Sequence, residues 1–78
     1  MNQNRFQKHF TKTIKMAQPE AEITWSEETE AFGQLTCYSV TLGGRESTGK
    51  IDLQHTAPYL VQGRAIDRAE LALFDLTN

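Results

Sequence analysis

QLTCYSVTLGGRESTGKIDLQ, residues 34–54, is the stretch that decides the fold of this 78-residue chain. The Gly-Gly pair at 43–44 separates two segments rich in β-forming residues, and it can supply the positive φ angles of a two-residue hairpin turn. Such a turn also sets the register of the two strands. The expected pairs are Val40–Ser47, Tyr38–Gly49, Thr36–Ile51 and Gln34–Leu53.

This register assigns every side chain of the hairpin to one face of the sheet. One face is mainly apolar, and on it Tyr38 covers the bare backbone of Gly49. Its apolar members are Tyr38, Val40, Leu42, Ile51 and Leu53. The other face is mostly polar and carries Leu35, Cys37, Ser39, Thr41, Glu46, Thr48, Lys50 and Asp52. A sheet with one apolar face needs a layer to cover it.

The residues before the hairpin predict a helix and a strand. Residues 2–17 form an amphipathic helix at about 100° per residue, and Pro19 ends it. The apolar side of this helix carries Phe6, Phe10, Thr13, Ile14 and Ala17. Residues 20–27 predict a strand with Ile23 and Trp25 on its inner face, and residues 28–33 predict a loop into the hairpin.

A second helix is predicted after the hairpin, with Thr56 as its N-cap and Pro58 in its first turn. Gly63 costs about 1 kcal/mol relative to alanine, so the helix could instead begin at Arg64. Its core stripe is Val61, Ala65, Ile66, Ala69, Ala72, Leu73 and Leu76. Both helices need the same sheet face, which predicts an α+β, two-layer αβββα sandwich of a single domain, residues 1–78.

The composition is that of a small globular domain, with 38% hydrophobic and 23% charged residues. The net charge of −2 gives no general attraction to nucleic acid. The single cysteine, Cys37, excludes an intramolecular disulfide and fits a reducing cytosol. No membrane span or signal peptide is apparent. We therefore expect a cytoplasmic protein with no cofactor, no metal site and no membrane partner.

Charge is distributed unevenly along the chain. The first seventeen residues carry four basic and no acidic side chains, and residues 20–30 carry five glutamates. The four basic residues fall on one side of the first helix, nearly opposite its apolar side: Arg5, Lys8, Lys12 and Lys15. A basic row of this kind fits phosphates or an acidic protein surface, and a simply solvated face is the alternative.

The order of elements resembles a double-stranded-RNA-binding domain, in which two helices pack on one face of a three-stranded sheet. The hairpin LTCYSVTLGGRESTGK is similar to that family's central strands, and RAELALFDL is similar to its closing helix. The resemblance implies this fold and contacts to duplex RNA. However, the family's lysine cluster would fall around Val61, Gln62 and Ala65, where only Arg64 and Arg68 are near. The family's histidine-bearing loop corresponds to the acidic residues 28–33.

Other candidate chemistry is weaker. Residues 44–51 nearly match a phosphate-binding loop, but Ile51 replaces the Mg²⁺-binding hydroxyl and a strand follows. His55 could act as a general base, as a histidine does in RNA-cleaving toxins of the HicA type, although their Gly-Ser-His context is absent. His9 and Cys37 are expected to be structural or bystander residues, and Trp25 is expected to be a core anchor.

Leu60, Leu71 and Phe74 fall beside the core stripe of the second helix, next to Arg64. Either a loop or the edge of the first helix covers these three residues, or they mark an interface. We predict a homodimer through this helix.

The sequence favours a non-enzymatic binding module, an accessory or inhibitor protein that docks on a protein or ribonucleoprotein partner. By analogy it is similar in kind to anti-defence proteins of phages and plasmids, including anti-CRISPR proteins. The alternative is direct binding of duplex RNA or other nucleic acid by the first helix with Arg64, Arg68 and Lys50. A third hypothesis is a ribonuclease toxin that uses His55.

Overall fold

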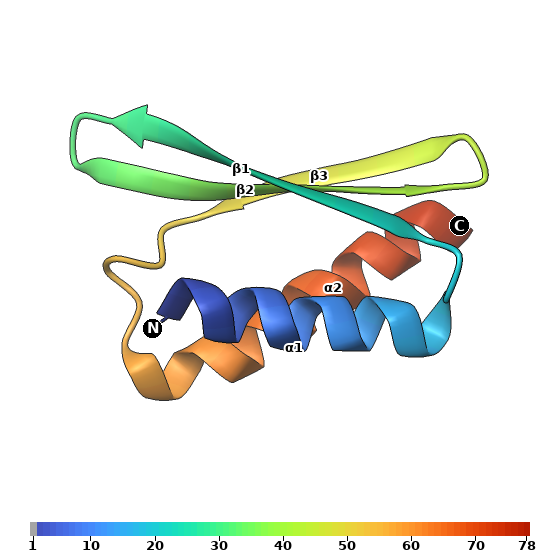
Figure 1. Ribbon diagram of the computed structural model, residues 1–78, viewed down its shortest axis with the longest axis horizontal. Helices are drawn as coiled ribbons and strands as arrows, with labels where there is room; N and C mark the ends of the chain where they lie inside the picture. The colour runs from blue at the N-terminus through green and yellow to red at the C-terminus, as the bar shows by residue number, and fades with distance from the viewer. Residues whose placement is uncertain (1) are drawn as a thin grey trace.

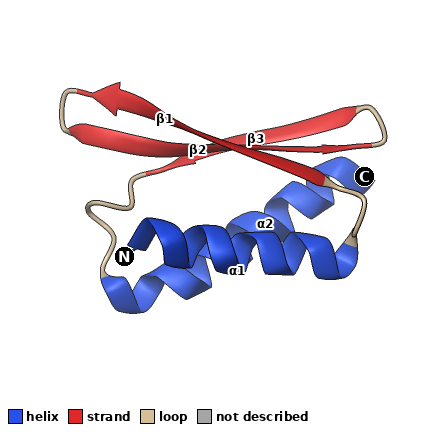
Figure 2. Ribbon diagram, viewed as in Figure 1, coloured by secondary structure: helices blue, strands red, loops and turns tan. Residues whose placement is uncertain are grey.

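A three-stranded antiparallel sheet and two helices make up the computed structural model, which describes residues 2–78. Their order is α1 (Asn2–Ala17), β1 (Glu22–Glu30), β2 (Gly33–Leu42), β3 (Arg45–Ile51), the short 3₁₀ helix η1 (Pro58–Leu60) and α2 (Val61–Thr77). The strands lie in the order β1-β2-β3, and both helices lie on one side of the sheet (Figures 1 and 2). The expected αβββα sandwich is therefore confirmed, and the first helix has the predicted bounds.

The central hairpin has the predicted register. Val40 pairs with Ser47, Tyr38 with Gly49 and Thr36 with Ile51. The turn glycines adopt positive φ angles, 58° at Gly43 and 81° at Gly44, which β-branched or bulky residues avoid. The fourth expected pair, Gln34 with Leu53, does not form because β3 ends at Ile51. Beyond that point the chain turns toward the helical layer.

The first strand begins at Glu22 and ends at Glu30, later at both ends than the predicted residues 20–27, and the expected loop over residues 28–33 is wrong. Pairing of β1 with β2 continues to Glu30 opposite Gly33, so only residues 31–32 remain in the turn. Gly33 allows this tight turn through its φ of 141°. An ion pair of 2.7 Å between Glu28 and Lys50 also spans the polar face of the sheet, across β2. The acidic run is therefore part of a strand: Glu28 lies on the polar face, and Glu27 lies on the face toward the helices, where it accepts a hydrogen bond from Gln3.

Four aromatic rings form the centre of the core between α1 and the sheet. They come from α1 (Phe6 and Phe10), β1 (Trp25) and β2 (Tyr38), and all six ring pairs have centroids 4.6 to 6.4 Å apart. Edge-on and tilted contacts at these distances are favourable for aromatic side chains. The rings thus bridge α1 to β1 and β2, whereas the backbone of α2 lies closer to the sheet, next to β3.

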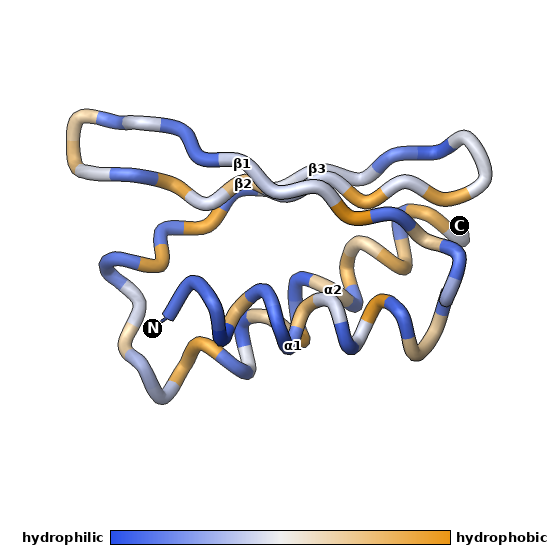
Figure 3. The backbone as a smooth tube through the Cα atoms, viewed as in Figure 1, coloured by the Kyte–Doolittle hydropathy of each residue, from blue (hydrophilic) through white to orange (hydrophobic). Residues whose placement is uncertain are grey.

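The other buried hydrophobic residues surround this aromatic cluster: Ile14, Ala21, Val40, Ile51, Leu53, Val61, Ala65, Ala69, Ala72 and Leu76. Hydrophobic positions recur among hydrophilic ones along both helices (Figure 3). Alanine dominates the buried side of α2, and small side chains let it lie close against α1. Ile66 was predicted to belong to this stripe but is only half-buried.

The second helix begins differently from the prediction. Thr56 does not cap it, because its hydroxyl donates to the carbonyl of Asp52 at 2.6 Å. The chain instead passes through η1, and α2 starts at Val61 with Gly63 inside it, not at Arg64. Arg68 fixes α2 to the sheet by donating to the Lys50 carbonyl at 2.9 Å.

Candidate functional site

The four basic residues predicted on one side of α1 are all exposed, but they fall into two groups. Arg5 donates from Nη1 to the carbonyl of Pro58 at 3.2 Å. Lys15 donates from Nζ to the carbonyls of Pro19, at 3.3 Å, and Ala21. These two cations therefore connect the two ends of α1 to η1 and to the loop between α1 and β1.

Lys8 and Lys12 form the second group. Neither side chain makes a hydrogen bond or an ion pair with any residue in 2–78, and both side chains are exposed. A shallow depression of about 670 Å³ lies beside them. We call its lining residues the α1 surface: Asn4, Gln7, Lys8, Thr11, Lys12 and Trp25. Its two ammonium groups are thus available to an external anion.

Trp25 gives the α1 surface an aromatic component. One side of the indole packs edge-on against Phe10, with ring centroids 5.3 Å apart, so its position is fixed by the core. The residue is nevertheless only half-buried, and it lines the depression next to the two lysines. Trp25 is therefore the core anchor that the sequence predicts and also part of the surface. Amide, hydroxyl, ammonium and aromatic groups together suit an irregular polar partner rather than a single small ion.

The other basic residues predicted for nucleic-acid binding are not joined to the α1 surface. Besides its bond to the sheet, Arg68 lies 3.4 Å from the hydroxyl of Tyr38. Lys50 is paired with Glu28, and its hydrogen bond holds the pKa of the Glu28 carboxyl below its ordinary value. Arg64 is exposed on the outer side of α2. Arg68 and Lys50 thus already have partners within the fold.

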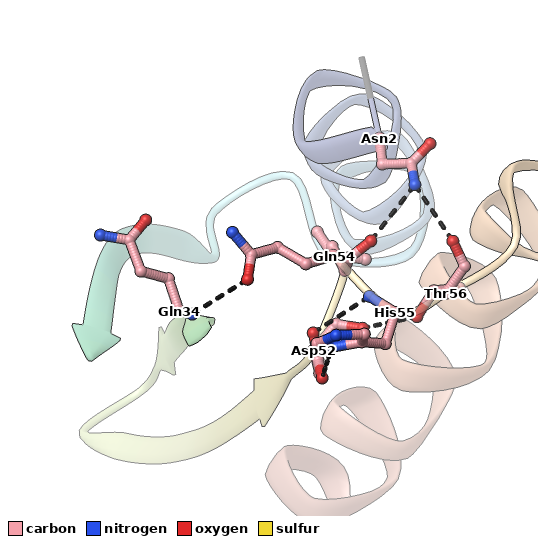
Figure 4. Close-up of polar contacts among 7 residues, drawn as sticks. Asn2, Gln34, Asp52, Gln54, His55 and Thr56 are labelled. Carbon is pink, nitrogen blue, oxygen red and sulfur yellow. Dashed lines mark hydrogen bonds and ion pairs between the residues drawn. The ribbon is translucent and has the colours of Figure 1, made fainter. Parts of the chain in front are cut away.

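His55 has a partner that sequence reasoning missed. Its Nδ1 lies 2.6 Å from Oδ2 of Asp52, and its backbone N–H donates to Oδ1 of the same carboxylate at 3.2 Å (Figure 4). The hydrogen bond from His55 lowers the pKa of the Asp52 carboxyl. An aspartate side chain can bond to residues that follow it in a local turn. The three-residue spacing of Asp52 and His55 was therefore a signal in the sequence for this contact. Because one carboxylate holds both backbone and ring, the contact shapes the turn after β3.

A cleft of about 390 Å³ opens at the same end of the molecule. Its polar walls are largely paired within the chain. Gln3 donates to Glu27 at 3.1 Å. The side-chain oxygen of Gln54 accepts from the backbone of Gln34 at 3.2 Å (Figure 4). Asn2 donates to two carbonyls of the loop after β3 (Figure 4). These amides tie the β1–β2 turn, the loop and α1 together, so the cleft is secondary to the α1 surface.

The apolar residues beside the core stripe of α2 are uncovered. Leu60 is 38% exposed, Leu71 61% and Phe74 63%. The expectation that a loop or the edge of α1 covers them is therefore wrong. Cys37 lies half-buried as a free thiol on the sheet face away from the helices.

No protein family, curated protein or solved structure matched the chain. Within residues 2–78, neither α-helix has the length and apolar character of a membrane-spanning segment. In the same range, no three metal-binding side chains of the His, Cys, Asp or Glu type gather around one point.

Proposed function

We propose that this protein is a non-enzymatic binding module that docks through its α1 surface on an acidic region of a protein or ribonucleoprotein partner. The observation that carries the proposal is the pair of unengaged lysines, Lys8 and Lys12, beside the fixed indole of Trp25. Tryptophan is one of the residues that most often dominate the binding energy of a protein interface. The charges contribute mainly to steering and specificity.

The distribution of charge supports a protein partner over duplex RNA. Binding to duplex RNA depends on many contacts to phosphate and 2′-hydroxyl groups. Here Arg5, Lys15 and Arg68 donate to backbone carbonyls, and Lys50 is paired with a glutamate. An RNA phosphate would have to displace these contacts. Lys8 and Lys12, with the separate Arg64 on α2, would release few counterions, and so would contribute little to nucleic-acid affinity.

We place the protein in the cytoplasm, as an accessory or inhibitor of a larger complex. A small domain with an exposed docking surface can block a larger partner without chemistry of its own. Anti-defence proteins of phages and plasmids, including anti-CRISPR proteins, act on this principle. The comparison with this protein is an analogy and is not based on a sequence motif. Under this proposal, the resemblance of the present chain to double-stranded-RNA-binding domains concerns the fold and not the ligand.

The test of this function is capture of a partner from a lysate of the source cells, with and without ribonuclease. The immobilised wild type should retain a defined protein or ribonucleoprotein. The double variant Lys8→Glu/Lys12→Glu should lose it, because both free cations are reversed. Circular dichroism of the variant should remain that of the wild type, since both side chains are exposed.

A parallel measurement with duplex RNA separates the alternatives. The probe is a duplex of about 16 base pairs, the span of a double-stranded-RNA-binding domain. We expect no binding beyond a weak, salt-sensitive association. Tight binding that falls steeply with salt and disappears in Lys8→Glu/Lys12→Glu would establish the RNA-binding alternative. Cleavage of the probe that is lost in His55→Ala would establish the toxin hypothesis instead.

A further inference from the structure

The outer side of α2 carries a continuous stripe that the rest of the chain leaves bare. At about 100° per residue, its members fall within an arc of about 80°. We call them the α2 stripe: Leu60, which is the last residue of η1 and the N-cap of α2, with Arg64, Asp67, Leu71 and Phe74. All five are exposed, and the buried alanines of α2 lie on the other side of the helix.

The charged members of the stripe have no partner among the described residues. The side chains of Arg64 and Asp67 form no hydrogen bond or ion pair with any residue in 2–78. Gly63 lies beside the stripe, and a Cβ there would meet no atom within 4 Å. No packing within the chain therefore requires a glycine at this position, where a neighbouring helix could approach closely.

We propose that α2 packs against α2 of a second copy of this chain, antiparallel, about a two-fold axis between residues 65 and 66. In this register Arg64 faces Asp67 of the partner subunit, and the symmetry repeats the pair. Leu60 faces Leu71 of the partner subunit. Phe74 extends over the turn that begins η1 of the other copy.

Charge complementarity favours a second copy of this chain as the partner of the α2 stripe, and it favours one register of the two helices. A parallel pair would place Arg64 against Arg64 of the partner subunit. Shifting the antiparallel register by three residues in either direction would oppose two arginines or two aspartates. Only the proposed register places each arginine against an aspartate, flanked by apolar contacts at both ends. A stripe that complements itself under two-fold symmetry is what an isologous interface requires.

The proposed interface is small, because each chain contributes one helix. Stable interfaces usually bury at least about 1,000 Å² in total, and a single pair of helices lies near that limit. We therefore expect a dimer in the micromolar range, measured by sedimentation equilibrium of the full chain up to about 100 μM.

Charge reversal provides the specific test. Arg64→Asp alone and Asp67→Arg alone should each weaken self-association by at least about tenfold, because like charges then face each other. The double variant Arg64→Asp/Asp67→Arg should dimerise again. An equimolar mixture of the two single variants should form a heterodimer, since every reversed residue then meets its opposite.

Three results would overturn the proposal: a wild type that stays monomeric at about 100 μM, single variants as associated as the wild type, or a mixture that does not associate. All the substituted side chains are exposed, so circular dichroism should confirm that each variant folds. The control Lys8→Glu/Lys12→Glu should leave dimerisation unchanged. The dimer and the proposed function of the α1 surface can therefore fail separately.

Discussion

At the scale of single residues, Gly49 shows how the hairpin register decides packing. The ring of Tyr38 occupies the space above it, and a Cβ at position 49 would overlap the Tyr38 side chain. Tyr38 is 6% exposed and is enclosed by the aromatic cluster, so it cannot move aside freely. We expect Gly49→Ala to lower the free energy of unfolding by about 1–3 kcal/mol, as overpacked cores do. Urea denaturation measures this loss.

The control for this prediction is a double-mutant cycle. In a Tyr38→Leu background the smaller side chain leaves room for the new methyl group. Gly49→Ala should therefore cost less in that background than in the wild type. Equal costs in the two backgrounds would mean that strand propensity, rather than the Tyr38 ring, requires the glycine.

The ion pair between Glu28 and Lys50, also a contact between single residues, predicts that the stability of the fold depends on pH. The hydrogen bond from Lys50 lowers the pKa of Glu28 below its ordinary value of 4.5. A carboxyl whose pKa is lower in the folded than in the unfolded state contributes its stability above the ordinary pKa. That contribution is lost as the pH falls through the lowered pKa.

The corresponding measurement is an NMR titration of the Glu28 side-chain carboxyl carbon. In the wild type the midpoint should lie below 4.5, and in Lys50→Met it should move up toward that value. An unchanged midpoint would show that Lys50 does not cause the shift. The side chains of Lys50 and Glu28 are 54% and 43% exposed, so high salt should reduce the effect.

At the scale of the elements, α2 contains a glycine, Gly63, whose replacement should stabilise the helix. Gly63 lies inside the helix, its φ is not positive, and the space beyond it is open. Alanine has a helix propensity about 1 kcal/mol better than glycine. Gly63→Ala should therefore raise the free energy of unfolding by about 1 kcal/mol, which would raise the melting temperature by roughly 4–8 °C in a domain of this size.

This prediction concerns the monomer, so melting is followed at low protein concentration. Gly33→Ala is the matched opposite case, because that glycine has a φ of 141° and its neighbour Gln54 fills the nearby space. It should lower the melting temperature. Stabilisation by Gly33→Ala, or destabilisation of the dilute protein by Gly63→Ala, would contradict this description of the two glycines.

At the scale of the whole molecule, the hairpin shows what the sequence could predict. Its turn glycines and its alternating pattern are local, and together they determine the register, the apolar face and the need for two helices on one side. The extension of β1 to Glu30 was not predictable in the same way. Acidic residues are common in loops, and what favours this strand is its pairing with β2 and a long-range ion pair to β3.

For a similar reason, only part of the candidate site could be predicted from the sequence. Helical spacing correctly placed four basic side chains on the exposed side of α1. It could not show that Arg5 and Lys15 reach carbonyls of η1 and of the loop between α1 and β1, since those contacts depend on the folded chain. Nor could spacing bring Trp25 of β1 beside Lys8 and Lys12, which only the packing of α1 on the sheet achieves.

The most direct test of the α1 surface compares two variants that change the net charge equally, from −2 to −4. Lys8→Gln/Lys12→Gln removes the two free cations, and Thr24→Glu/Thr48→Glu adds two anions on the sheet face away from the helices. The measured quantity is the amount of partner that each variant retains after capture from source-cell lysate. We predict that the lysine variant loses the partner and that the threonine variant retains it at the wild-type level. Equal retention by the two variants, or loss only in the threonine variant, would contradict a docking site on α1.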